Sequence, residues 1–131
     1  MKEITLMDFQ RSKYDLEDRL VEFACMCLRV CDLLPNTKSG QNLEYQLSKS
    51  GTAPALIYGE AQAAESRADF LHKMGLVLKE IKETRINLKI IIRKPVLIHE
   101  CVDKAFKESN ELMAIFIASV QTAKKKMKLV S

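Results

Sequence analysis

Apolar residues recur at three- and four-residue steps along residues 66–94, a stretch without proline. These steps place one set of side chains along one side of an α-helix: Phe70, Met74, Leu78, Ile81, Leu88 and Ile92. A helix over this stretch would be about 43 Å long. Because its apolar side must be covered, we expect other long helices of the same chain beside it.

The opposite side of this helix also carries apolar residues, namely Leu76, Ile86 and Ile90. Scattered aliphatic side chains on a surface are ordinary. A core already accounts for the other side, however, so we favour a second buried surface against a neighbouring subunit. Leu112 and Ile115 widen the apolar face of the last helix beyond what one core requires. All five are therefore candidate interface residues.

Three further segments have a helical period. Residues 15–34 repeat apolar side chains up to Pro35, which ends the helix because it disfavours helical geometry in the residue before it. A loop over residues 35–40 leads to a second helix, capped by Asn36 or Thr37. Ser66 is the expected cap of the helix described above, and the last helix runs from about residue 101 to 127.

The second helix contains Gly51 and Pro54. Inside a helix a proline loses one hydrogen bond and clashes with the preceding turn, at a cost of about 3 kcal/mol. We therefore expect a kink or a brief break between these residues, with Thr52 capping a restart.

Four helices with short links predict an all-α, antiparallel, up-down-up-down four-helix bundle. A chain of 131 residues is long enough for one core but not for two. We place the bundle domain at residues 15–131 and an N-terminal arm, without a sustained period, at residues 1–14.

Composition agrees with a helical cytoplasmic protein. The chain has only four glycines and three prolines, the residues that favour turns, and no tryptophan, so we expect long segments with few connections. No apolar run approaches the length that spans a membrane, and charged residues occupy the place of a signal peptide's apolar region. Three of the four cysteines cluster within seven residues, at Cys25, Cys27 and Cys31, which favours reduced core thiols. A zinc site with Cys101 is the less favoured alternative, because C-x-x-C pairs are missing.

The net charge of +4 is unevenly distributed. Acids dominate residues 15–34, whereas two groups of cations follow later in the chain: Lys79, Lys82, Arg85, Lys89 and Arg93, then Lys124, Lys125 and Lys126. The first group is either a solvated face that pairs with acids of a neighbouring copy or a surface for phosphates. No aromatic residue is interleaved with these cations. The chain therefore lacks the aromatic side chains on which proteins that bind single-stranded nucleic acids stack the bases.

No nucleophile and base motif is recognisable around the two histidines, His72 and His99. Inward E-x-x-H repeats, which a di-metal bundle needs, do not occur. We therefore expect no catalytic activity, no cofactor and no metal. Glu60 is the one acid in an apolar neighbourhood, where a buried carboxylate would need Arg85 or Lys89 as partner. The alternative, a structural ion pair or a solvated surface acid, is the interpretation that we favour over a functional group.

Three stretches carry a family resemblance by their order and spacing: RLVEFACMCLRVCDLLPNTKSGQNLEYQLSKSGTAPALIYGEAQAAESRADFLHKM, LKEIKETRINLKIIIRKP and ESNELMAIFIASVQTAKK. Over about residues 15–127 the chain resembles a bacterial family of four-helix-bundle proteins, some encoded by intervening sequences in 23S ribosomal RNA genes. The resemblance implies a left-handed antiparallel bundle that assembles into a ring-shaped homopentamer, with no established activity. Relatives include accessory proteins of diversity-generating retroelements, whose basic pentamers bind RNA and a reverse transcriptase.

The second helix of that family usually ends in a motif resembling S-x-x-x-x-x-x-N-x-x-E-G. Ser50 and Glu60 fit the motif, while Ile57 replaces the asparagine and Ala61 the glycine. A polar site therefore does not carry over to this end of the bundle. The sequence predicts a non-enzymatic oligomeric scaffold or adaptor that presents a shared surface to a macromolecular partner. The alternative is sequence-tolerant binding of RNA or DNA by the basic residues of the last two helices.

Overall fold

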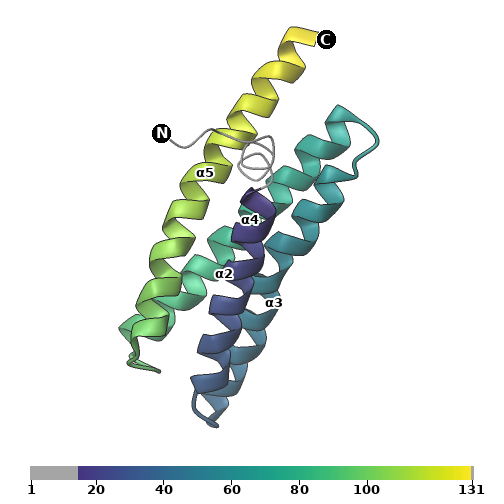
Figure 1. The fold of residues 1–131 in the computed structure, drawn as a ribbon. Coiled ribbons are helices and arrows are strands. Elements are labelled where there is room, and N and C mark those ends of the chain that lie inside the picture. The colour runs from purple at the N-terminus through teal and green to yellow at the C-terminus, as the bar shows by residue number, and fades with distance from the viewer. Residues whose placement is uncertain (1–14, 131) are drawn as a thin grey trace, which may run out of the picture.

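Four α-helices joined by short loops make up residues 15–130, the part of the chain that the computed structural model describes (Figure 1). They are α2 (Asp15–Leu33), α3 (Lys38–Gln62), α4 (Arg67–Arg93) and α5 (Glu100–Val130). These residues contain no strand, which confirms the predicted all-α class. The predicted N-terminal arm lies outside the described residues. No helix among residues 15–130 combines the length and apolar character needed to cross a membrane.

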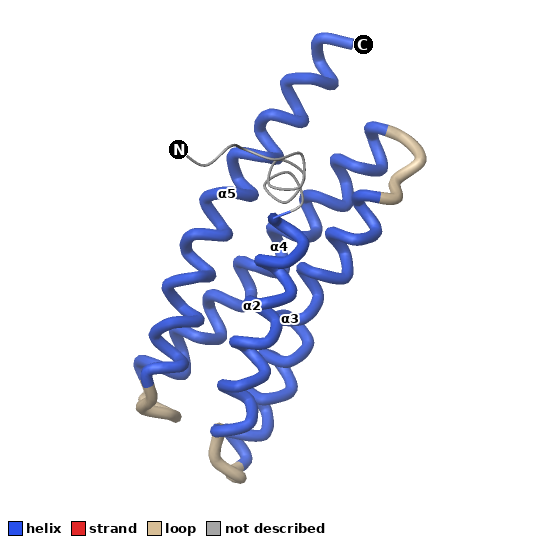
Figure 2. The backbone as a smooth tube through the Cα atoms, in the orientation of Figure 1, coloured by secondary structure: helices blue, strands red, loops and turns tan. Residues whose placement is uncertain are grey.

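Helices that follow one another in the chain pack together, α2 with α3, α3 with α4 and α4 with α5, and the first and last of them, α2 and α5, also pack together. The backbones of the two diagonal pairs, α2 with α4 and α3 with α5, are not packed side by side, and these helices meet only through side chains in the core. Consecutive helices that pack together through short loops run antiparallel, as the tube in Figure 2 shows. The predicted up-down-up-down bundle is therefore confirmed.

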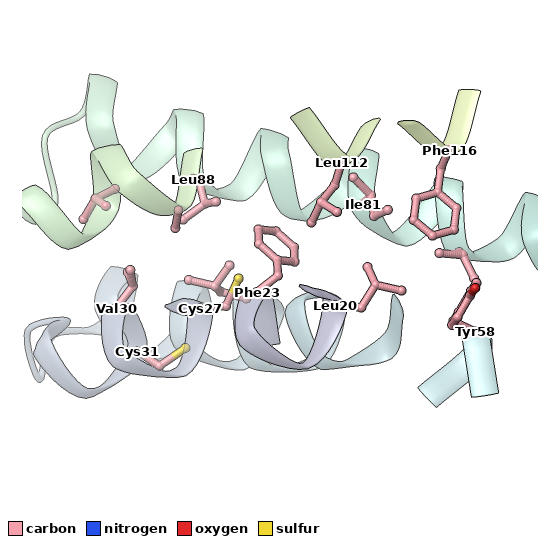
Figure 3. Packing of buried hydrophobic residues seen from close by; sticks show 14 of the residues in the cluster. Leu20, Phe23, Cys27, Val30, Cys31, Tyr58, Ile81, Leu88, Leu112 and Phe116 are labelled. Atoms are coloured by element: carbon pink, nitrogen blue, oxygen red, sulfur yellow. The ribbon is translucent and has the colours of Figure 1, made fainter. Parts of the chain in front are cut away.

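The core lies along the bundle axis and receives side chains from all four helices (Figure 3). Leu20, Phe23 and Cys27 of α2 are fully buried. At one end of the core, the rings of Tyr58 in α3 and Phe116 in α5 meet edge to face, with centroids 5.8 Å apart. Edge-to-face pairs add to the stabilisation that burial alone provides.

Both predicted caps form. The hydroxyl of Thr37 accepts a hydrogen bond from the amide of Gly40 at 3.0 Å, and that of Ser66 accepts one from the amide of Asp69 at 3.0 Å. Gly40 also lies against the preceding loop, because a Cβ at this position would be 1.9 Å from the carbonyl oxygen of Pro35.

Of the two alternatives for the second helix, the break is wrong, and the kink stays a prediction. α3 runs without interruption through Gly51 and Pro54, both of which are buried. Thr52 caps no restart, since its hydroxyl donates to the carbonyl of Ser48 at 2.7 Å, one turn earlier in the same helix. Packing against α2 and α4 holds the segment helical and offsets the cost of the proline.

Leu112 is not an interface residue, because it is fully buried in the core. Ile115 is half-buried and packs against the same core. The prediction that these two residues exceed the needs of one core is therefore wrong for Leu112. α5 needs the wider apolar face because it contacts both α4 and α2.

The helices differ in length, which leaves one end of the bundle unequal. α5 has 31 residues whereas α2 has 19. Figure 1 shows the C-terminal end of α5 extending well beyond the first turn of α2.

Candidate functional site

Two isoleucines form the exposed apolar part of α4. Ile86 is 53% exposed and Ile90 is 48% exposed. They are four residues apart and therefore lie on the same side of the helix. Together with Lys89, Arg93 and Lys94 they line a shallow hollow of about 340 Å³. The outer face of α4 thus combines an apolar centre with a basic edge.

Leu76, the third predicted residue on this side, is half-buried. It lies ten residues before Ile86 and is not among the residues that line the hollow. The exposed apolar face therefore occupies the second half of α4. Its role as an interface stays a prediction.

Arg85 is held inside the bundle. Its Nε donates to Oδ1 of Asn110 in α5 at 2.6 Å, and its guanidinium lies over the ring of Phe106, 5.5 Å from the centroid. The half-buried side chain ties α4 to α5. Arg85 is therefore a structural residue rather than a free cation for phosphates.

The other predicted cations of α4 differ in their surroundings. Lys79 pairs with Glu83 at 4.0 Å, Lys82 is exposed, and Lys89 is half-buried beside the isoleucines. Arg93 lies in the last turn of α4, next to the loop that leads into α5.

Lys124, Lys125 and Lys126 are exposed near the far end of α5. Because α5 runs antiparallel to α4, they lie at the opposite end of the bundle from Arg93 (Figure 1). The neighbouring cation at their end is Arg67, which lines a hollow together with Lys126. Arg67 is not among the predicted cations, since only the antiparallel packing brings the first turn of α4 to the last turns of α5.

Glu60 is not buried, and this prediction is wrong. Its side chain is 57% exposed and lies 3.5 Å from Nζ of Lys73, not beside Arg85 or Lys89. The surrounding alanines and Tyr58 are apolar, but Glu60 is on the side of α3 that faces solvent. The alternative of an ion pair near the surface therefore holds.

A small polar hollow of about 190 Å³ lies between α3 and α4. Glu80 and Glu83 line it together with Lys49 and Lys79. Burial raises the pKa of Glu80 above the usual range of a carboxyl group, and the neighbouring Glu83 raises it further. Oε2 of Glu80 is buried and has no hydrogen-bond partner in the described residues. The spacing of three residues places both acids on one side of the helix, which is the only sign of this pair in the sequence.

The cysteines are reduced. Cys27 and Cys31 are buried, Cys25 and Cys101 are half-buried, and all four are free thiols. Burial raises the pKa of Cys27 far above its usual range and raises that of Cys31 to about 11. Among residues 15–130, no three side chains of histidine, cysteine, aspartate or glutamate converge as metal ligands would.

Comparison with known proteins points to one family. No family model and no curated protein matches the chain. A crystal structure does match, that of a protein with unknown function from the S23 ribosomal protein family of Bacteroides thetaiotaomicron VPI-5482. It has 30% sequence identity and a TM-score of 0.73, over 79% of this chain and 96% of that one. The chain belongs to the S23 ribosomal protein family.

Membership of the S23 family agrees with the resemblance seen in the sequence. The function of the Bacteroides relative is unknown, and its description names no enzymatic activity. Pentamer formation, RNA binding and cytoplasmic location stay predictions for this chain.

In this S23 protein the family's serine position has a structural role. Ser50 is buried, and its hydroxyl accepts a hydrogen bond from Nδ2 of Asn87 at 3.1 Å. Ile57, in the place of the family's asparagine, packs against the core. The middle of α3 is therefore joined to α4 by this polar contact, and Ile57 adds packing further along α3.

Proposed function

We propose that the protein is a non-enzymatic scaffold that assembles with identical copies and presents their shared surface to a macromolecular partner. The observation that carries this proposal is the exposed pair Ile86 and Ile90 on α4. Two half-exposed isoleucines side by side leave apolar area in water that a second copy would bury, with a gain of about 25 cal/mol for each Å².

A complementary surface exists on α2. Val21 and Leu28 are exposed there, seven residues apart and hence on one side of the helix. The exposed acids Asp18, Glu22 and Asp32 lie on the same helix. Glu22 pairs with the exposed Arg29 of this helix at 3.3 Å, so Asp18 and Asp32 supply the acidic surround of the apolar pair. This face is the counterpart of the apolar and basic face of α4.

The bundle geometry favours a head-to-tail assembly. α2 and α4 lie diagonally across the core without packing side by side, so their outer faces point away from opposite sides of the bundle. Joining the α4 face of one copy to the α2 face of the next produces a ring when the rotation closes. The homopentamer that the family resemblance implies is a closed ring of this kind, and we propose that state here.

The mass in solution tests the assembly. Each copy has a mass of 14.9 kDa, so a pentamer should scatter light as five copies. Ile86→Glu with Ile90→Glu should reduce the mass to that of one copy, because buried carboxylates would be unpaired. Leu56→Glu is the control, since Leu56 is 70% exposed on α3, away from both faces. A wild-type protein that is monomeric at every concentration would contradict the proposal.

Mixing two variants tests the head-to-tail arrangement. One variant carries Ile86→Glu with Ile90→Glu, and the other carries Val21→Lys with Leu28→Lys. Each alone should be a monomer, and together they should form a one-to-one dimer through the two intact faces. If the α4 face instead paired with itself, the Val21 and Leu28 variant would dimerise alone.

Binding of RNA or DNA is the second candidate, favoured by the exposure of Lys124, Lys125 and Lys126 at one end of α5. A ring would repeat this group in every copy, and repeated weak contacts raise the overall affinity. Lysines would contact the phosphates of the nucleic acid, which are the same in every base sequence, so binding at this surface would not depend on base sequence.

A gel shift with RNA over a series of salt concentrations tests this candidate. Lys124→Glu with Lys125→Glu should weaken binding, and the slope of log affinity against log salt should fall by about 1 for each lost phosphate contact. Lys89→Glu with Arg93→Glu changes the same charge at the other end of the bundle. Absence of a shift at low salt would remove the nucleic-acid candidate and leave the scaffold intact.

A further inference from the structure

The outer side of α2 carries one strip of residues: Asp18, Val21, Cys25, Leu28 and Asp32. They follow one another at steps of three and four residues and therefore lie along one side of the helix. Both aspartates are exposed, Val21 is 49% exposed and Leu28 is 41% exposed. The α2 strip thus has an apolar middle with an acid at each end.

The outer side of α4 carries a strip with the same steps: Lys79, Glu83, Ile86, Ile90 and Arg93. The isoleucine pair is its apolar middle, and a cation lies at each end. Glu83 pairs with Lys79 at 4.0 Å within the helix. Arg93 is exposed and forms no ion pair with another of the residues 15–130, so its charge is available to an acid of another molecule.

The two strips lie at the same height along the bundle axis. A Cβ added to Gly51 of α3 would lie 2.6 Å from Cβ of Cys27 and 3.9 Å from Cγ2 of Thr84, so Cys27 of α2 and Thr84 of α4 are level. Figure 3 shows Leu20 of α2 across the core from Ile81 of α4. A residue of α2 is therefore level with the residue about sixty positions later, on α4.

This difference in numbering aligns the two strips part by part. Leu28 is level with the isoleucine pair of α4. At one end of the strips Asp32 is level with Arg93. At the other end Asp18 is level with Lys79. Each acid of the α2 strip therefore has a cation of the α4 strip at its own height, and the apolar middles coincide.

Equal height determines which kind of assembly the two strips allow. Copies in a ring are related by rotation alone, so the surfaces that meet lie at the same height along the ring axis. Surfaces at different heights would add a translation at every contact and produce an open helical filament. α2 and α4 also run in the same direction, as alternate helices of the antiparallel bundle (Figure 2). Upright, parallel copies can therefore join strip to strip without a shift.

We propose that the copies stand upright and parallel in the ring, with Arg93 of each copy paired to Asp32 of the next copy. Leu28 then packs between Ile86 and Ile90 of the neighbouring α4. Opposite charges beside an apolar contact fix the register in which two surfaces meet. This inference rests on the head-to-tail assembly proposed above and adds its direction and its register.

A parallel ring has two unlike ends. Lys124, Lys125 and Lys126 lie at one end of each bundle, so parallel copies bring all of these groups to one end of the ring (Figure 1). The opposite end carries the loop between α2 and α3 and the loop between α4 and α5. The two ends therefore present different surfaces to a partner.

Charge reversal tests the register. Asp32→Arg alone and Arg93→Asp alone should each move dissociation of the assembly to a protein concentration at least about tenfold higher, because like charges then meet. The double variant with both changes should assemble at the wild-type concentration, since every contact regains an opposite pair. Light scattering over a concentration series measures the three variants.

Asp32→Arg with Lys79→Asp is the matched control. It has the same formal charge as the double variant, but position 79 is level with Asp18, at the other end of the strip. This variant should stay weakened. If the two helices met antiparallel, Asp32 would lie opposite Lys79, and the control would recover instead of the Asp32 and Arg93 double variant.

The outcomes separate the register from the assembly itself. Recovery of the control, or of neither double variant, in a wild-type protein that assembles and that Ile86→Glu with Ile90→Glu dissociates, would overturn the register and not the scaffold. A mass that keeps rising with concentration would indicate a filament and overturn the level arrangement. A monomeric wild-type protein would overturn both proposals.

Discussion

Gly51 marks the closest approach of α3 to α2. A Cβ added to this residue would lie 2.6 Å from Cβ of Cys27 and 2.9 Å from its Sγ. Both residues are buried, so neither side can move without opening the core. Gly59, eight residues later on the same helix, is exposed and has no atom within 4 Å of such a Cβ. Two glycines in one helix therefore have opposite structural roles.

Alanine substitutions should separate these roles. Gly51→Ala should lower the free energy of unfolding by about 1–3 kcal/mol, because the added methyl group overpacks the contact with Cys27. Gly59→Ala should raise it by about 0.5–1 kcal/mol, through the better helix propensity of alanine alone. Urea denaturation of the two variants gives both values. Equal effects of the two substitutions would show that Cys27 does not restrict position 51.

At the scale of elements, α2 is attached to α5 by a polar contact between their outer edges. Nε and one terminal nitrogen of Arg19 donate to the two carboxylate oxygens of Glu108, each at 2.9 Å. A further hydrogen bond runs to Glu111 at 3.1 Å. The hydrogen bonds from Arg19 hold the pKa of Glu108 below its usual range. Paired hydrogen bonds of this type fix orientation as well as adding energy.

This contact should depend on pH with a definite sign. A carboxyl group whose pKa is lowered by folding stabilises the protein above its unfolded pKa, and the contribution is lost as pH falls through the folded value. Glu108→Gln should therefore lower the free energy of unfolding by about 1 kcal/mol at pH 7, and the difference should shrink below about pH 4. Thermal denaturation at both pH values measures it. Glu111→Gln, on the more exposed carboxylate, should change stability by less than about 0.5 kcal/mol.

At the scale of the whole molecule, the bundle has two unlike outer faces on diagonal helices. The α4 face is apolar with basic neighbours, and the α2 face is apolar with acidic ones. The association that we propose through these faces would make stability depend on concentration, because binding of the folded state shifts the folding equilibrium. The melting temperature of the wild-type protein should therefore rise with protein concentration. That of the Ile86→Glu and Ile90→Glu variant should not.

The candidate site was predictable from sequence only in part. Ile86 and Ile90 stand out because they oppose the apolar side of a long helix, and the structure finds both exposed. Leu112 looked equivalent in the sequence but is buried, since the width of an apolar face does not show how many helices cover it. Arg85 looked like one cation among several, and only its contacts with Asn110 and Phe106 show that it is structural.

By itself the sequence determined the number, order and approximate bounds of the four helices, because apolar period, prolines and caps are local properties of the chain. It also placed the caps Thr37 and Ser66. Only the tertiary structure decided that α3 continues through Pro54 and that Glu60 faces solvent. It also decided that Arg67 lies near the lysines of α5. Each of these depends on which helices pack side by side, and packing energy outweighs the local preference of a single residue.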